Sequence, residues 1–242
     1  MADFFRGIPD RLELFGGLHI AISVIFIICA VLLLCFGEKL RRYGNKKPIR
    51  IAMASLLALN MILHYGSRIV LGIWSIEGDL PLHLCYITNF AMIYILLTDN
   101  RHDIYKYFYY FTFIGPLPAI IWPDLDYSWQ SYIFWHFIIS HHIMLLISLY
   151  SLVALEYKVS LKSMLPAFVV GNVYIAAVAG LNRLIGTNYI MITELPDQLY
   201  EIYPFLKYLP PIFWLELVGV LAMLLSYLPA YFHNRKHGRA QA

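Results

Sequence analysis

Long apolar runs alternate with short polar connections along the chain, and this pattern predicts membrane-spanning helices. The runs cover residues 16–37, 51–74, 83–98, 107–122, 133–155, 164–185 and 211–232. A helix needs about 20 apolar residues to cross the hydrocarbon core of a bilayer. We therefore expect an all-α polytopic membrane protein with seven transmembrane helices, folded as one integral membrane domain over residues 1–242.

The fourth run differs from the others because it is short and interrupted. Gly115, Pro116 and Pro118 lie inside it. Proline removes a backbone donor and clashes with the preceding helical turn. We expect this helix to kink or unwind near its outer end.

The basic residues indicate how the helices are oriented. Thirteen of the eighteen Lys and Arg residues fall in the connections 38–50, 99–106 and 156–163 and in the C-terminal tail. The last basic residue of the tail is Arg239. Connections rich in Lys and Arg stay in the cytoplasm. We therefore expect the N-terminus outside, the C-terminus in the cytoplasm, and a multi-pass location in the cell membrane.

The composition excludes several other classes of protein. The chain is 60% hydrophobic and 14% charged, whereas soluble domains average about 25% charged residues. A formal net charge of +3 is too small to indicate nucleic acid as a partner. Three cysteines form neither a disulfide framework nor a zinc framework.

Polar residues inside the apolar runs gather in one layer. The members of this layer, all in the outer halves of the predicted helices, are His19, His64, Arg68, His83, Cys85, His136, His141, His142, Asn182, Arg183 and Glu216. Ionisable groups at membrane depth are costly unless they are paired or hydrated. We expect the layer to line a shared cavity that opens outward, although any single member can instead be a structural hydrogen bond between helices.

Of the three cysteines, Cys85 is the one that falls in this polar layer. Cys29 and Cys35 lie inside the first apolar run, where we expect them to pack. Cys85 stands at the outer start of a predicted helix, where the helix dipole favours a thiolate. His141 has a similar predicted depth in the fifth run. A cysteine with a histidine base is the minimum for nucleophilic acyl transfer, so the two residues form a candidate catalytic pair.

Five segments resemble the YwaF-like family of bacterial integral membrane proteins. These segments are DLPLHLCYI (79–87), PDLDY (123–127), FWHFIISH (134–141), NRLIGTNYIMI (182–192) and the closing YPF…PPIFWLE stretch (203–216). The resemblance covers nearly the whole chain and keeps the segments in order. That family is related in turn to a vertebrate transmembrane acyltransferase that moves acyl chains between phospholipids and ether lysophospholipids.

The resemblance implies a membrane-embedded lipid acyltransferase that acts on membrane phospholipids from the outer leaflet. The cysteine of the acyltransferase matches Cys85 and its histidine matches His141. His136 matches a histidine of the bacterial members only, and His83 stands where members often carry glutamate. Thr187 replaces the second of two glycines that often precede Asn-Tyr.

Further polar residues are expected to support this chemistry or to bind substrate. Amide and phenol groups would donate to the oxyanion, an arginine would pair with a lipid phosphate, and a carboxylate would orient a histidine. The candidates are His64, Arg68, His83, His136, Asn182, Arg183, Asn188, Tyr189 and Glu216.

Two alternatives stay open. A metal could lie between helices on histidines at positions 19, 64, 83, 136 and 141. None of these five is four residues from another, and positions 136 and 141 are about 140° apart around a helix, so we expect neither a metal nor another cofactor. The second alternative is a non-enzymatic lipid or small-molecule transporter or sensor with a histidine-rich outer cavity, against which the lack of internal repeats argues mildly.

Overall fold

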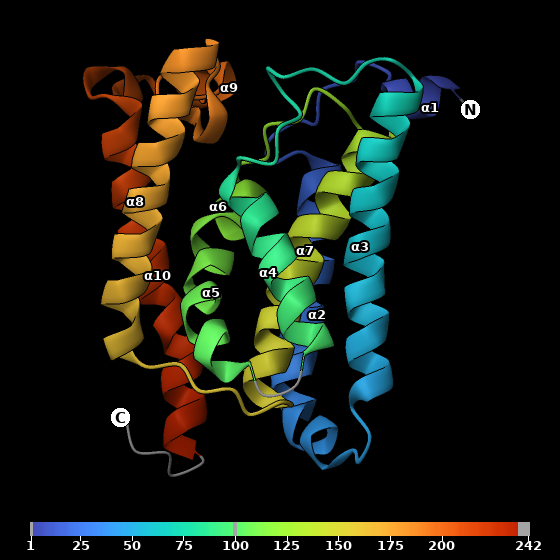
Figure 1. Ribbon diagram of the computed structural model, residues 1–242, viewed down its shortest axis with the longest axis vertical. Helices are drawn as coiled ribbons and strands as arrows, with labels where there is room; N and C mark the ends of the chain where they lie inside the picture. Colours follow the sequence, from blue (N-terminus) through green and yellow to red (C-terminus); the bar gives the residue numbers. More distant parts are fainter. Residues whose placement is uncertain (1, 99–100, 237–242) are drawn as a thin grey trace.

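The computed structural model describes residues 2–98 and 101–236, and the chain is all-helical over these ranges apart from an isolated bridge between Pro9 and Tyr127. The elements, shown in Figure 1, are α1 (Ala2–Arg6), α2 (Gly17–Arg42), α3 (Lys47–Val70), α4 (Leu84–Leu97), α5 (His102–Ile114), α6 (Pro116–Ile121), α7 (Tyr132–Val153), α8 (Leu161–Ile185), η1 (Tyr189–Met191), α9 (Asp197–Ile202), η2 (Pro204–Tyr208) and α10 (Pro211–Lys236).

Every predicted apolar run contains a helix, so the positions of the helices are confirmed. Among the described residues, five helices are long and apolar enough to cross a membrane: α2, α3, α7, α8 and α10. The other two runs form shorter helices, with 14 residues in α4 and 13 in α5. The protein is therefore a membrane protein with several apolar helices.

The predicted break in the fourth run is confirmed. Gly115 caps the end of α5 and the start of α6, and Pro116 is the first residue of α6. Proline is tolerated there because the first turn of a helix leaves its donors unbonded. The break lies against the start of α4, since a Cβ atom on Gly115 would lie 3.5 Å from the backbone nitrogen of Cys85.

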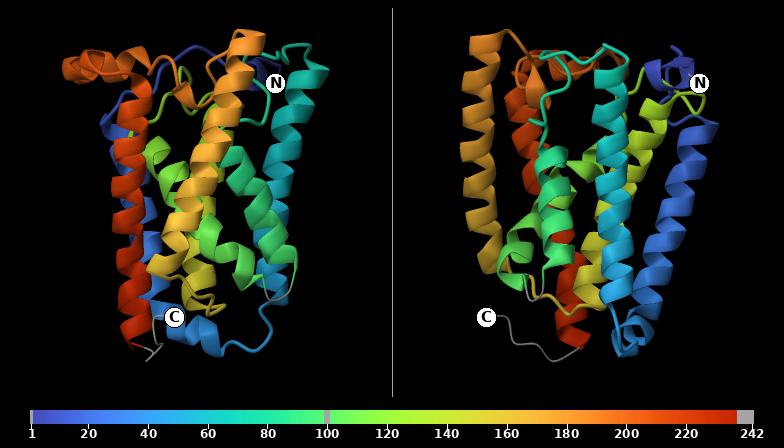
Figure 2. Two further views of the ribbon diagram at one scale, coloured as in Figure 1. Left: turned by 60° about the vertical axis from the view of Figure 1, so that its left-hand side comes forward. Right: turned by 45° about the vertical axis from the view of Figure 1, so that its right-hand side comes forward.

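Helix α7 is the centre of the bundle and is buried along most of its length. It contacts α2, α3, α4, α5 and α6, while α8 and α10 lie together on one side and α3 on the other (Figures 1 and 2). The outer helices expose apolar side chains such as Ile25, Leu59, Val173 and Leu225. Apolar surface of this extent is unusual for a soluble protein and suits contact with lipid.

The bundle has an N-terminal end and a C-terminal end. The N-terminal end holds α1 and the connections 71–83, 122–131 and 186–210 (top of Figure 1). The C-terminal end holds the connections 43–46 and 154–160 and the end of α10. The basic residues of the 38–50 connection lie at the C-terminal end, where Arg41 pairs with Glu156 at 3.3 Å. Arg239 lies outside the described residues.

Three fully buried tyrosines anchor α5 inside the bundle. Tyr105 donates to the carbonyl of Ser148 on α7 at 2.6 Å. Tyr109 and Tyr110 donate to carbonyls of α10 and of the residue before α8, at 2.7 and 2.8 Å. Because each phenol is satisfied, α5 is held in the interior without an unpaired polar group. This position brings the break after α5 against the start of α4.

Candidate functional site

Two histidines from different helices stack face to face at the N-terminal end. The rings of His64 on α3 and His136 on α7 have centroids 3.9 Å apart and planes 11° apart, and each residue is 6% exposed. Asn60, one turn before His64, donates to the carbonyl of His136 at 3.1 Å and to the hydroxyl of Ser140 at 2.8 Å. The carbonyl of Asn60 accepts from Tyr132 at 3.0 Å. These bonds hold α3 and α7 in the register that stacks the rings.

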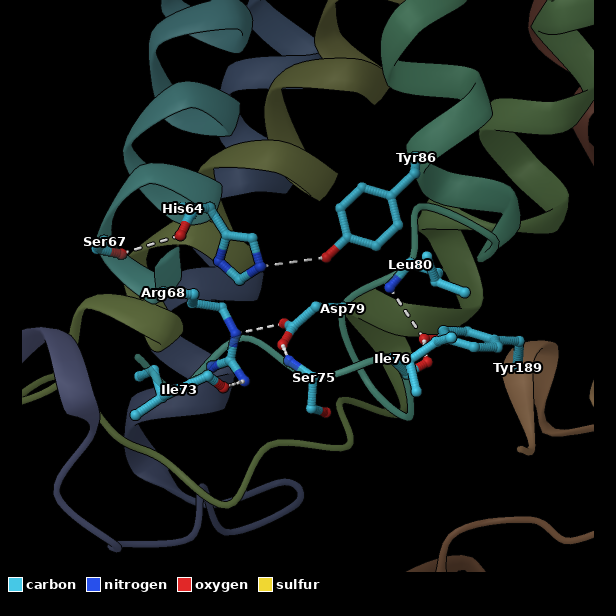
Figure 3. A network of polar contacts seen from close by, with 10 residues as sticks. All are labelled: His64, Ser67, Arg68, Ile73, Ser75, Ile76, Asp79, Leu80, Tyr86 and Tyr189. Atoms are coloured by element: carbon cyan, nitrogen blue, oxygen red, sulfur yellow. Dashed lines mark hydrogen bonds and ion pairs between the residues drawn. The ribbon is translucent and has the colours of Figure 1, made fainter. Parts of the chain in front are cut away.

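Tyr86 of α4 closes the stack from a third helix. Its hydroxyl lies 3.5 Å from Nε2 of His64 (Figure 3), and its ring is 6.4 Å from that of His136. These residues and Tyr65, whose hydroxyl interacts with that of Tyr86, form the histidine cluster. Two sealed ring nitrogens of the cluster, Nδ1 of His64 and Nδ1 of His136, have no hydrogen-bond partner among the described residues. An unsatisfied buried polar group costs about 1–3 kcal/mol, so the cluster is suited to receive a polar ligand group.

Cys85 is the second residue of α4 and is half-buried with a free thiol. It lies within electrostatic range of three phenols, those of Tyr65, Tyr86 and Tyr174. Tyr174 reaches across from α8 and donates to the carbonyl of Leu82 at 2.7 Å. The remaining cysteines are both exposed on α2.

His141 lies on α7 and is 7% exposed. Its Nδ1 donates to the carbonyl of Phe137 at 2.7 Å, which leaves the lone pair of Nε2 available. Nε2 has no hydrogen-bond partner among the described residues. His83 lies within electrostatic range of His141. In the described part of the chain no hydrogen bond joins the thiol of Cys85 to His141.

Arg68, at the end of α3, is engaged by the connection that leads to α4. It forms an ion pair with Asp79, which is 3% exposed (Figure 3). It also donates to the carbonyl of Ile73 at 3.2 Å. Asp79 in turn accepts from the backbone of Ser75 at 2.8 Å. The arginine therefore acts here as an internal cross-link of the 71–83 connection.

Tyr189 of η1 joins the same connection to the 186–210 segment. Its hydroxyl donates to the carbonyl of Ile76 at 2.6 Å and accepts from the backbone of Leu80 at 2.9 Å. Its ring meets that of His83 edge-on at 5.4 Å. Burial raises the pKa of the Tyr189 phenol, so the hydroxyl remains a donor at neutral pH.

The two candidate asparagines hold the turn after α8. The amide of Asn182 donates to the carbonyl of Tyr189 at 2.9 Å and accepts from its backbone nitrogen at 3.0 Å and from Thr187 at 2.8 Å. Asn188 is exposed and accepts from both the backbone and the hydroxyl of Thr193. Both amides are occupied by bonds within this segment.

Among the described residues, no hydrogen bond joins Arg183 or Glu216 to the stacked histidines. Arg183 is exposed in the last turn of α8. Glu216 on α10 accepts from the amide of Asn172 on α8 at 3.4 Å. Both ring nitrogens of His19 have hydrogen-bond partners outside the stack: one accepts from the backbone of Phe15 and the other donates to the carbonyl of Ile120.

No group of three or more His, Cys, Asp or Glu side chains within the described residues is arranged to share a metal ion. A cavity of about 370 Å³ lies at the C-terminal end, and neither His64 nor His136 lines it. Its lining is mainly apolar and comes from α2, α7 and α10: Leu34, Gly37, Glu38, Val153, Leu228, Pro229, Phe232 and His233.

Comparison with known proteins assigns the chain to a family. A model of the TMEM164 family matches residues 14–228. The chain belongs to the TMEM164 family. It is also 29% identical over 232 residues to an uncharacterized protein of Treponema pallidum (strain Nichols), which covers 94% of this chain and 92% of that protein. No solved structure matches the chain significantly.

The part of the chain matched by the TMEM164 family includes the whole histidine cluster and also residues that the sequence pattern did not single out. These are Asn60, Tyr65, Asp79 and Tyr86. Two of them could have been suspected from the sequence, because Tyr65 directly follows the candidate His64 and Tyr86 directly follows the candidate Cys85. Tyrosine is common near membrane interfaces, so their phenols do not stand out in the sequence.

Proposed function

We propose that this TMEM164-family protein is a membrane-embedded lipid acyltransferase with Cys85 as nucleophile and His141 as base. The observation that carries the proposal is the unbonded Nε2 of His141 on α7, a helix that packs against α4, in which Cys85 is the second residue. The DLPLHLCYI segment adds support through its resemblance to the YwaF-like family and the related ether-phospholipid acyltransferase.

The proposed reaction proceeds in two half-reactions. His141 takes the proton of the Cys85 thiol, and the thiolate attacks the acyl carbonyl of a phospholipid. The leaving lysophospholipid takes that proton, and the acyl group remains on Cys85 as a thioester. A lysolipid hydroxyl or water then attacks the thioester, which forms the new ester or free acid and restores the thiol.

Substrate binding has to bring the thiol and the imidazole together, as catalytic hydrogen bonds often tighten only in the complex. Tyr65 is the proposed oxyanion donor, because its phenol lies in electrostatic range of Cys85, whereas Asn182 is fully bonded. Arg183 is the arginine that we assign to a lipid phosphate, since Arg68 is paired with Asp79.

The proposal includes seven membrane crossings in the cell membrane, with the N-terminal end outside and the C-terminal end in the cytoplasm. Helix α4 and the pair α5–α6 would complete the count beside the five long helices. The basic 38–50 connection supports the orientation. Protease treatment of intact cells tests it: a tag at the N-terminus should be cut and a tag at the C-terminus protected, and the reverse pattern would refute it.

The decisive experiment is intact-protein mass spectrometry after incubation of the purified protein with a phospholipid mixture. We expect an acyl mass increment that hydroxylamine removes. It should be absent from Cys85→Ala and retained by Cys29→Ala, which removes an exposed cysteine of α2. His141→Gln should slow its appearance about 10²–10⁴-fold, the usual contribution of a general base.

An unmodified wild-type protein, with Cys85 also unreactive toward a lipid-soluble thiol probe, would contradict the proposal. The histidine cluster would then be assigned to a non-enzymatic lipid or small-molecule transporter or sensor. Full biological activity of Cys85→Ala would point the same way.

A further inference from the structure

The stack of His64 and His136 is not used by the first half-reaction, yet it holds two sealed and unpaired ring nitrogens. Buried polar atoms without partners are uncommon in native proteins and call for an explanation. Here both belong to one stack, which three helices enclose with Asn60 below and Tyr86 beside it. The arrangement is that of a subsite awaiting a hydrogen-bonding group.

The chemistry of the two nitrogens selects the class of ligand. When Tyr86 donates to Nε2 of His64, Nδ1 of His64 carries the hydrogen and becomes a donor. Nδ1 of His136 can then supply a lone pair. A hydroxyl group accepts one hydrogen bond and donates another, so it satisfies both atoms at once.

A phosphate is a poorer match for this subsite. The nearby cation, Arg68, is already neutralised by Asp79. A buried anion without a counterion carries a large desolvation cost, whereas an alcohol is neutral. The subsite therefore fits the uncharged hydroxyl of a lysolipid rather than its headgroup phosphate.

We infer that His64 and His136 bind the acceptor hydroxyl of a lysophospholipid and take up its proton in the second half-reaction. The inference rests on the proposed function. The oxygen of the acceptor attacks the thioester carbonyl, the C–S bond breaks, and the hydroxyl proton passes to the histidine pair. The pair then returns that proton to the thiolate of Cys85, so the enzyme is restored without any other reactant.

The stacked geometry keeps the two imidazoles together, with ring centroids 3.9 Å apart. The 3.5 Å contact between Tyr86 and His64 is the longest hydrogen bond around the stack, and the donor role of Nδ1 of His64 depends on it.

The test separates the two half-reactions. The thioester is first formed on the protein with phospholipid, lysophosphatidylcholine is then added, and loss of the acyl mass and formation of diacyl product are followed in time. For His136→Gln and for His64→Gln we expect thioester formation close to that of the wild type. Transfer to the lysolipid should be at least about 100-fold slower.

His142→Gln is the matched control, because His142 is a buried histidine of the same helix whose ring packs against Phe26 of α2. Both half-reactions should remain unchanged in this variant. Tyr86→Phe removes only the hydroxyl beside His64 and provides a variant that keeps the packing of the cluster; its transfer step should slow about tenfold while loading stays normal.

Transfer at the wild-type rate in both histidine variants, or equal slowing in His142→Gln, overturns the inference and leaves the proposed function standing. Failure of the wild-type protein to form a thioester overturns the proposed function and this inference together. If the histidine variants do not fold, Tyr86→Phe decides, and normal transfer in that variant refutes the subsite.

Discussion

Arg68 and Asp79 form an ion pair that ties the end of α3 to the connection before α4. Asp79 is 3% exposed, so its carboxylate depends on the arginine and on the backbone of Ser75 for compensation. The pair also decides which arginine remains for a ligand, because Arg68 has its charge neutralised inside the protein. The pair thus positions the 71–83 connection, which ends at His83 just before Cys85.

Asp79→Asn should destabilise the protein by about 3 kcal/mol, because breaking a buried pair leaves an uncompensated charge on Arg68. The thermal unfolding temperature in detergent measures the effect. Asp79→Asn combined with Arg68→Gln should lose less than the sum of the single losses. Additive losses would show that the two side chains do not depend on each other.

Tyr189→Phe should loosen the 71–83 connection while leaving the helices intact. The change leaves the carbonyl of Ile76 and the backbone nitrogen of Leu80 without their partner, at a cost of about 1–3 kcal/mol. Hydrogen exchange of the 71–83 amides should become faster. Tyr203→Phe is the control, since its hydroxyl meets only Trp122 at 3.4 Å, and equal effects of the two changes would contradict the role of Tyr189.

Asn60→Leu should lower stability by about 1–3 kcal/mol, because the carbonyl of His136 and the hydroxyl of Ser140 lose a buried donor on α3. Loss of the register between α3 and α7 should also weaken the contact between His64 and His136. Thermal unfolding measures the first effect. Asn172→Leu, which removes a longer bond of 3.4 Å between α8 and α10, should be milder, and the opposite order would refute this account.

Gly37→Ala should destabilise the contact of α2 with α7. An added Cβ atom would lie 2.9 Å from Cβ of Val153, and overpacking of this kind costs about 1–3 kcal/mol. Gly180→Ala is the matched control, because its Cβ would meet nothing within 4 Å and alanine favours a helix by up to about 1 kcal/mol. The two changes should move the unfolding temperature in opposite directions. Val153→Gly removes both atoms that the added Cβ would meet at 2.9 Å, so its loss and that of Gly37→Ala should add to less than their sum in the double variant, and additive losses would place the strain elsewhere.

The sequence by itself determined where the helices lie. Hydropathy and proline act locally, so the seven apolar runs and the break at Gly115 could be read directly, and the structure confirms both. The number of membrane crossings and their orientation remain predictions, since α4 and α5 are shorter than a typical span. The shared polar layer also stays a prediction, because residue number gives depth along a helix but not contact between helices.

Only the tertiary structure decided which members of that layer meet. His64 stacks on His136, and Arg68 pairs with Asp79. The amide of Asn182 is hydrogen-bonded within the turn after α8. Each successive residue turns the side chain by about 100° around a helix axis. A contact therefore depends on how each helix is rotated and packed against its neighbours, and those rotations are set by distant bonds such as that from Asn60 to His136, which no local pattern contains.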